Sequence, residues 1–204
     1  MNAVGPPWIF VHVQKTGGNA VRSALGMTMN DAHKHFFARE LRDIYGRAAW
    51  DASFKFAFVR NPWDRLVSWW SMIDSGRDFI DPARPPNSFF GYVLERARNF
   101  EEFILRCTDE IADLDGRKQI FRNQIDYLVD DSGAVIVDYI GRFERLQECF
   151  NEVSRRLGRT PVDLPRLNAS QHAAYTEYYT PATAKIVATH YARDVEEFGY
   201  RFGE

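Results

Sequence analysis

A lysine followed by two glycines comes soon after the first apolar segment of the chain. Residues 9–13 are apolar except for one histidine, residues 15–18 read Lys-Thr-Gly-Gly, and residues 21–25 are compatible with a helix. A glycine turn between a buried strand and a helix directs unpaired backbone N–H groups inward, and the helix dipole favours an anion beside them. The sequence therefore predicts a cradle for a phosphate or sulfate at this turn, with the charge of Lys15 at its edge.

An arginine and a serine form a second candidate anion site. Arg60 follows the apolar run 54–59, and Ser68 lies two turns into the helix predicted after Asn61. A guanidinium at a strand end can bind an anion through two parallel hydrogen bonds, and a helix hydroxyl can donate to the same oxygens. Taken singly, Arg60 could form a surface salt bridge and Ser68 could be a neutral helix position. Together with the glycine turn, they predict electropositive pockets at two neighbouring strand ends.

The order of residues in the glycine turn argues against an ordinary ATPase or kinase loop. A Walker-type loop has its lysine and hydroxyl residue after the glycines, whereas here both precede them. For the turn taken alone, the alternative is a tight strand-to-helix connection with a solvated lysine. A P-loop nucleotide kinase and a non-catalytic nucleotide-binding protein with the same cradle therefore remain as alternative functions.

The length of 204 residues favours one globular domain over residues 1–204, with the proline-containing segment 78–88 as a mobile loop. Hydrophobic residues make up 45% of the chain and aromatic residues 15%, which suits a packed core. The formal charge of −2 provides no global positive field for nucleic acid. Cys107 and Cys149 are expected to be buried free thiols, and no cluster of metal ligands is convincing, so no metal is expected.

The apolar stretch near residue 8 does not have the pattern of a targeting segment. It has no basic region before it and is interrupted by His12. No run in the chain approaches the ~20 apolar residues that span a bilayer. We therefore expect a cytoplasmic protein with no transmembrane segment, and the sequence leaves its oligomeric state open.

Short apolar segments alternate with amphipathic ones along the chain. Because each is short and apolar at nearly every position, three segments are predicted to be buried parallel strands: residues 9–13, 54–59 and 135–140. Five segments are predicted to be helices: residues 62 to about 76, 89–107, 118–129, 144–157 and 181 to about 199. The alternation predicts an α/β fold, a three-layer P-loop-like domain with a short central parallel sheet flanked by helices. In such a fold, ligands bind at the carboxyl ends of the strands.

At this spacing, the two anion motifs resemble those of the sulfotransferases, specifically the family that includes the carbohydrate sulfotransferases (sulfotransferase family 2). Residues 12–18 look like that family's loop for the 5′-phosphosulfate end of 3′-phosphoadenosine 5′-phosphosulfate (PAPS), and residues 60–68 look like its 3′-phosphate motif. The chain departs from the family at Gln14, where most members have proline, and at Asn19, where threonine or serine is usual. The resemblance continues in residues 138–144, 164–168 and 191–200.

The resemblance implies transfer of a sulfuryl group from PAPS to an acceptor hydroxyl or amine by in-line displacement. It implies a carbohydrate or other small acceptor and adenosine 3′,5′-bisphosphate as the product. Lys15 is expected to stabilise the bridging oxygen of the leaving 5′-phosphate, and this arrangement requires no metal. The residues expected to bind the donor are Lys15, Thr16, Gly17, Gly18, Asn19, Ala20, Arg60 and Ser68.

The acceptor hydroxyl also needs a general base, for which histidine is the usual choice near neutral pH. His33 and His35 lie just beyond the helix-compatible segment 21–25 that follows the glycine turn, in a region that resembles the one where the carbohydrate branch of the family carries its base. Because alternate residues of an extended segment face opposite ways, one of the two should point inward, and we favour His35. An exposed His-Lys-His turn is the alternative. His12, inside the first predicted strand, is expected to be a packed core residue.

Overall fold

The described part of the chain forms two compact units. The computed structural model describes residues 7–28, 32–76, 88–107, 120, 122–165 and 173–204. The first unit is drawn from residues 1–60 and 124–168, and the second from residues 61–123 and 169–204. The chain first passes from one unit to the other between Arg60 and Asn61. A single domain over the whole chain stays a prediction, and the predicted loop 78–88 lies, except for Ser88, outside the described residues.

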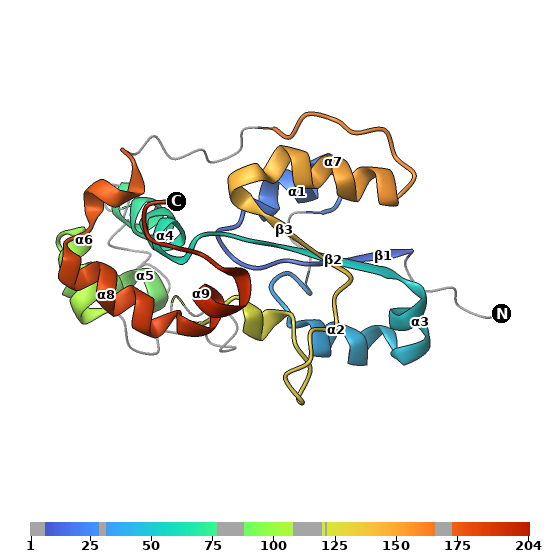
Figure 1. The fold of residues 1–204 in the computed structure, drawn as a ribbon, viewed down its shortest axis with the longest axis horizontal. Helices are drawn as coiled ribbons and strands as arrows, with labels where there is room; N and C mark the ends of the chain where they lie inside the picture. Colours follow the sequence, from blue (N-terminus) through green and yellow to red (C-terminus); the bar gives the residue numbers. More distant parts are fainter. Residues whose placement is uncertain (1–6, 29–31, 77–87, 108–119, 121, 166–172) are drawn as a thin grey trace. The chain divides into compact units, whose positions relative to one another are not determined.

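A parallel three-stranded sheet forms the centre of the first unit (Figure 1). Its strands, in spatial order, are β1 (Trp8–Val11), β2 (Phe54–Val59) and β3 (Tyr139–Arg142). Phe56 is central to the register, because it pairs with Phe10 on one side and Tyr139 on the other. The strands are parallel, so their carboxyl ends meet at one edge of the sheet. The predicted α/β fold with a short parallel sheet is confirmed.

Helices cover both faces of this sheet (Figure 1). The helices on one face are α1 (Gly18–Ala24) and α7 (Leu146–Arg156), and those on the other are α2 (Ala38–Tyr45) and α3 (Arg47–Ala52). Strand side chains alternate between the faces, so phenylalanines at every second position share one side. The core on the α1 and α7 side contains Phe10, Phe56, Phe58, Val21, Leu25, Phe150 and Val153. This packing fixes the segments that follow the strands.

The third strand is shorter and later than the sequence predicts. The apolar run 135–140 was expected to be a buried strand, but β3 begins at Tyr139. Val135 instead forms an antiparallel bridge with Val129 and is 41% exposed. The Asp130 side chain accepts the N–H groups of Ser132 and Ala134, which closes a tight turn before the chain enters the sheet. An apolar run alone does not distinguish such a hairpin arm from a sheet strand.

The described part of the second unit is built around helices. They are α4 (Pro62–Ser75), α5 (Ser88–Arg96), α6 (Phe100–Arg106), a short 3₁₀ helix (Tyr175–Tyr178), α8 (Pro181–His190) and α9 (Ala192–Phe198). The start of α4 is as predicted, because the Asn61 side chain accepts the N–H of Trp63 at 3.1 Å and Pro62 occupies the first helical position.

Several predicted helices have different bounds in the structure. The segment 89–107 is divided between α5 and α6, and the segment predicted from 181 is divided into α8 and α9 at Tyr191. Asn99 separates the first pair by capping α6, where its side chain accepts the N–H of Glu102. Within the described part of 118–129 the helical residues are a 3₁₀ turn at Ile125–Tyr127, and α7 follows a second one at Phe143–Arg145. Helices α2 and α3 were not predicted.

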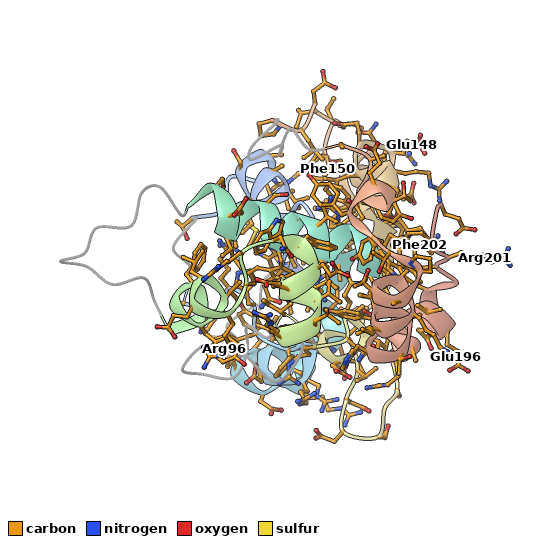
Figure 2. The ribbon with its side chains drawn as sticks, turned by 90° about the vertical axis from the view of Figure 1, so that its left-hand side faces the viewer. Arg96, Glu148, Phe150, Glu196, Arg201 and Phe202 are labelled. Atoms are coloured by element: carbon orange, nitrogen blue, oxygen red, sulfur yellow. The ribbon has the colours of Figure 1, made fainter. Side chains whose placement is uncertain are left out.

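The last residues of the chain pack on the start of α4 within the second unit. The ring of Phe202 lies 5.7 Å from that of Trp63 and 5.5 Å from that of Tyr179, centroid to centroid. Asn61 Nδ2 donates to the carbonyl of Arg201 at 3.0 Å, while the Arg201 side chain points outward beside Phe202 (Figure 2). These contacts fix the end of the helix that carries Ser68.

Candidate functional site

The turn between β1 and α1 adopts an unusual backbone conformation. Gly17 caps α1 with a φ of 77°, and Lys15 has a φ of 65°, which is uncommon for a residue with a side chain. The Thr16 hydroxyl donates to the carbonyl of Val13 at 2.9 Å and is buried. Thr16 therefore closes the turn with its side chain, and its backbone N–H is the group predicted to meet an anion.

Both glycines of the turn are required by close approaches. A Cβ on Gly18 would overlap the imidazole of His12, and one on Gly17 would come within 2.5 Å of Leu146 Cδ2. His12 is buried and stacks on Phe10 with ring centroids 5.2 Å apart, which confirms its predicted place in the core. The turn thus packs tightly against the core beneath it.

Arg60 directly follows the carboxyl end of β2, and its side chain contacts this turn. Its Nη1 donates to the carbonyl of Lys15 at 3.3 Å, and the residue is only 6% exposed. The face of the Phe143 ring lies below the guanidinium, with Cζ 4.0 Å from the ring centroid. The structure therefore brings together the two cationic residues that the sequence assigned to separate strand ends.

The electrostatics of this pair favour an anion. Burial, followed by the positive charge of Arg60, lowers the pKa of Lys15 from 10.5 to about 8. Two cations near each other in a partly desolvated place each disfavour the charge of the other, and an anion between them would reverse that effect. The arrangement can bind a phosphate or sulfate.

Asn19, which stands where a hydroxyl residue was expected, contacts a third cation. Lys34 Nζ donates to Asn19 Oδ1 at 3.0 Å. Because the amide oxygen accepts this hydrogen bond, the NH₂ group of Asn19 is the part of the side chain that can donate to a phosphate. Ala20, the next residue in α1, is buried, and its backbone N–H donates to the Gly17 carbonyl at 3.0 Å. The phosphate contacts of both residues stay predictions.

His35 lies against the backbone of His12. It is 9% exposed, its Nδ1 is 3.0 Å from the carbonyl oxygen of His12, and the two ring centroids are 4.4 Å apart. A carbonyl oxygen only accepts hydrogen bonds, so Nδ1 of His35 carries the ring proton when the ring is neutral. Nε2 is then the basic nitrogen of His35, which is the state that a general base requires.

The premise that selected His35 over His33 was wrong. Residues 32–35 form a turn rather than an extended segment, and His35 has a φ of 72°. The two histidines nevertheless differ in burial, as predicted, because His35 is buried. His33 is only half-buried, with its ring 5.3 Å from that of Phe36 and 6.3 Å from that of Tyr45, centroid to centroid. The turn conformation, and not strand alternation, turns His35 inward.

The surroundings of His12 are electropositive. Burial holds the pKa of its imidazole well below 6.5, and the charges of His35, Lys34 and Arg22 act in the same direction. His12 is therefore neutral at physiological pH. This result indicates that cationic groups surround the glycine turn from α1 and from the His33–His35 segment as well as from β2.

Ser68 belongs to the second unit. It is buried in the middle of α4, at 7% exposure. The proposal that its hydroxyl shares a phosphate with Arg60 stays a prediction.

Two residues that contact Arg60 were missed by the sequence analysis. Gln124 Oε1 accepts the backbone N–H of Arg60 at 2.8 Å, and Gln124 Nε2 donates to the Arg60 carbonyl at 2.7 Å. Phe143 supplies the ring below the guanidinium. Gln124 was placed in a predicted helix, where glutamine carries no special signal. Phe143 had one available signal, its position directly after β3.

The described residues contain neither a cluster of metal ligands nor a membrane-spanning helix. Within that part of the chain, no three histidine, cysteine, aspartate or glutamate side chains gather closely enough to hold a metal ion. No helix in the same residues has both the length and the apolar character needed to cross a membrane.

The sequence was compared with known families and proteins. A family model described as the sulfotransferase family matches residues 8–201, and both the glycine turn and Arg60 lie within the match. Because this match spans nearly the whole chain, the protein belongs to sulfotransferase family 2. No curated protein and no solved structure gives a significant match. Membership of this family supports sulfuryl transfer as the general activity.

Proposed function

We propose that the protein transfers a sulfuryl group from PAPS to an acceptor hydroxyl or amine and releases adenosine 3′,5′-bisphosphate. The observation that carries this proposal is the Arg60 guanidinium next to the Lys15 turn, at the carboxyl edge of a parallel sheet. The sulfotransferase family generally uses this donor. A carbohydrate is the proposed acceptor class, and it rests on the sequence resemblance alone.

The cationic groups suit a ligand with an anionic group at each end. Lys15 and the backbone N–H groups of residues 16–19 bind the 5′ end, and Arg60 binds the 3′-phosphate. The lowered pKa of Lys15 supports this assignment, because burial lowers it most and the positive charge of Arg60 lowers it further, and a bound anion would favour the charged lysine. The fit is one of charge and hydrogen-bond donors: Lys15 and Arg60 have donors only, and neither repels a phosphate.

Different residues act on the leaving group and on the acceptor, which lie on opposite sides of the sulfuryl group. When bound, PAPS supplies the sulfuryl group and a 5′-phosphate leaving group. Lys15 donates a hydrogen bond to the bridging oxygen as the S–O bond breaks, which stabilises the charge that develops there. His35 accepts the acceptor's proton at Nε2 as the new O–S or N–S bond forms.

A transfer assay with two histidine variants tests the function and the base together. We expect His35→Ala to lower labelled-sulfate transfer by about 10²–10⁴-fold without weakening the binding of adenosine 3′,5′-bisphosphate. His33→Ala is the matched control and should retain both properties, because its ring packs against Phe36 and Tyr45. Undiminished turnover in His35→Ala would remove His35 from the mechanism.

The same assay separates the alternative functions. Magnesium-dependent ATP binding with no use of PAPS would favour a nucleotide kinase. Binding of adenosine 3′,5′-bisphosphate without transfer to any acceptor in a broad panel would favour a non-catalytic nucleotide-binding protein. Labelled transfer to an acceptor in extracts of the source cell, with the product identified by mass, would support the proposed function and identify the acceptor.

A further inference from the structure

One buried side chain fixes the backbone of Arg60. Register pairing between β2 and β3 ends at Val59 and Arg142, so Arg60 lies one residue beyond it. There the Gln124 amide forms hydrogen bonds with both backbone groups of Arg60. Its Oε1 accepts from the Arg60 N–H at 2.8 Å, and its Nε2 donates to the Arg60 carbonyl at 2.7 Å. A carboxamide carries the same donor and acceptor as a peptide unit, so Gln124 acts as one more unit of a neighbouring strand. Gln124 is fully buried.

An aromatic ring fixes the other end of the same residue. The face of Phe143 lies 4.0 Å below the guanidinium carbon of Arg60. The same ring also lies close to the glycine turn, since a Cβ on Gly17 would come within 3.2 Å of Phe143 Cδ2 and Cε2. Phe143 therefore contacts both the turn and the arginine, and the Lys15 carbonyl holds Nη1. Backbone and guanidinium are each held by a different element of the first unit.

We propose that Gln124 and Phe143 are positioning residues that orient Arg60 to bind the 3′-phosphate of the donor. The inference rests on the proposed function, because it takes from there that Arg60 binds this phosphate. Arginine has many rotamers, and ordering such a side chain on binding weakens affinity. Two restraints that act before the ligand arrives remove part of that cost, so their loss should weaken recognition of the 3′-phosphate more than recognition of the rest of the nucleotide.

A purely structural role predicts a different result from a positioning role. If Gln124 only stabilised the end of the sheet, its loss would weaken the binding of all nucleotides by the same factor. The discriminating quantity is the ratio of affinities for adenosine 3′,5′-bisphosphate and adenosine 5′-monophosphate, because the two ligands differ only in the 3′-phosphate. For the unmodified chain we expect the bisphosphate to bind about 100-fold more tightly.

Five variants of the full chain test the inference by calorimetry with these two nucleotides. Gln124→Met, which is nearly isosteric, should reduce the affinity ratio about five- to tenfold, and Phe143→Leu should reduce it about threefold. In Arg60→Ala, the additional Gln124→Met change should reduce the ratio no further. Gln147→Met is the matched control, because the Gln147 amide also bonds two backbone groups, the Val162 carbonyl and the Leu164 N–H. Its ratio should be unchanged.

Each outcome decides between the hypotheses. An unchanged ratio in both Gln124→Met and Phe143→Leu, with or without weaker binding overall, overturns the inference and leaves these residues a structural role. If Gln124→Met does not fold, Gln124→Glu replaces it: it keeps the acceptor for the Arg60 N–H, loses the donor to the carbonyl, and should still lower the ratio. A ratio near one in the unmodified chain contradicts the proposed function itself, because Arg60 would then not bind a 3′-phosphate.

Discussion

The two ends of β2 hold cationic side chains in opposite ways. At the amino end, Lys55 Nζ lies 3.0 Å from Asp138 Oδ2, and the same oxygen accepts the Lys55 N–H at 2.7 Å. At the carboxyl end, Arg60 contacts the Lys15 carbonyl, and its charge contributes to the lowered pKa of Lys15. A carboxylate neutralises the lysine at the first end, whereas a second cation stands beside the lysine at the other.

This difference separates structural charge from functional charge. A paired lysine at a sheet edge holds two strands in register and gains little from any ligand. A lysine whose pKa is lowered by burial and by a neighbouring arginine disfavours the unbound folded state, and that cost is offset only when an anion binds. Substitutions at the two ends should therefore have opposite effects on stability, and only those at the carboxyl end should lower activity.

Of the changes at the two ends of β2, Lys15→Met should have the largest effect, lowering sulfuryl transfer by about 10²–10³-fold. The same change should raise the free energy of unfolding at pH 7. The pKa of Lys15 is about 8 in the folded state against 10.5 for an ordinary lysine, so the folded state holds this proton less tightly. The stability cost is fully present below pH 8 and disappears above pH 10.5. Transfer assays and thermal unfolding measure both effects, and a less stable Lys15→Met would contradict the account.

Arg60→Ala should weaken binding of adenosine 3′,5′-bisphosphate by about 10–100-fold. Adenosine 5′-monophosphate should bind as before, because it lacks the phosphate that Arg60 contacts. Arg60→Lys should restore little of the loss, because a single ammonium cannot reproduce the two parallel hydrogen bonds of a guanidinium. Calorimetry with both ligands measures the difference, and full rescue by lysine would indicate that net charge alone matters.

The pH dependence of binding should follow Lys15. Below pH 8 the lysine is protonated and ready to bind an anion, and above pH 8 binding must first take up a proton. Affinity for adenosine 3′,5′-bisphosphate should therefore fall above pH 8, by up to about tenfold per pH unit. Lys15→Arg should remove this inflection. A constant affinity from pH 7 to pH 9.5 in the unmodified chain would contradict this prediction, because protonation of Lys15 would then not control binding.

The smallest functional effect is expected at the amino end of the strand. Lys55→Met should lower the free energy of unfolding by about 1–2 kcal/mol, because the pair with the partly exposed Asp138 is lost. Donor affinity and transfer should stay unchanged. Urea denaturation combined with the transfer assay tests this, and an activity loss comparable to that of Lys15→Met would abolish the distinction between the two ends.

Local signals predicted part of the fold. Strand β2 and the start of α4 were predicted correctly, because an uninterrupted apolar run and an Asn-Pro cap depend only on neighbouring residues. Strand β3 was misplaced because Val135 pairs in a hairpin that no apolar pattern reveals. The division between α8 and α9 at Tyr191 also lacks a glycine or proline that would mark it.

The candidate site was predictable where chemistry restricts the residue type. The glycines of the turn and the cations Lys15 and Arg60 could be recognised because few other residues suit an anion cradle. Gln124 could not, because its role depends on a pairing across 64 positions of sequence. His35 was selected through an incorrect backbone conformation, and its catalytic role stays a prediction.

A crystal structure with adenosine 3′,5′-bisphosphate tests most directly whether the donor binds between Lys15 and Arg60. We expect the 5′-phosphate at the glycine turn within hydrogen-bond distance of Lys15 Nζ, and the 3′-phosphate on the guanidinium of Arg60 above Phe143. A nucleotide bound with neither phosphate at these two residues would contradict the account.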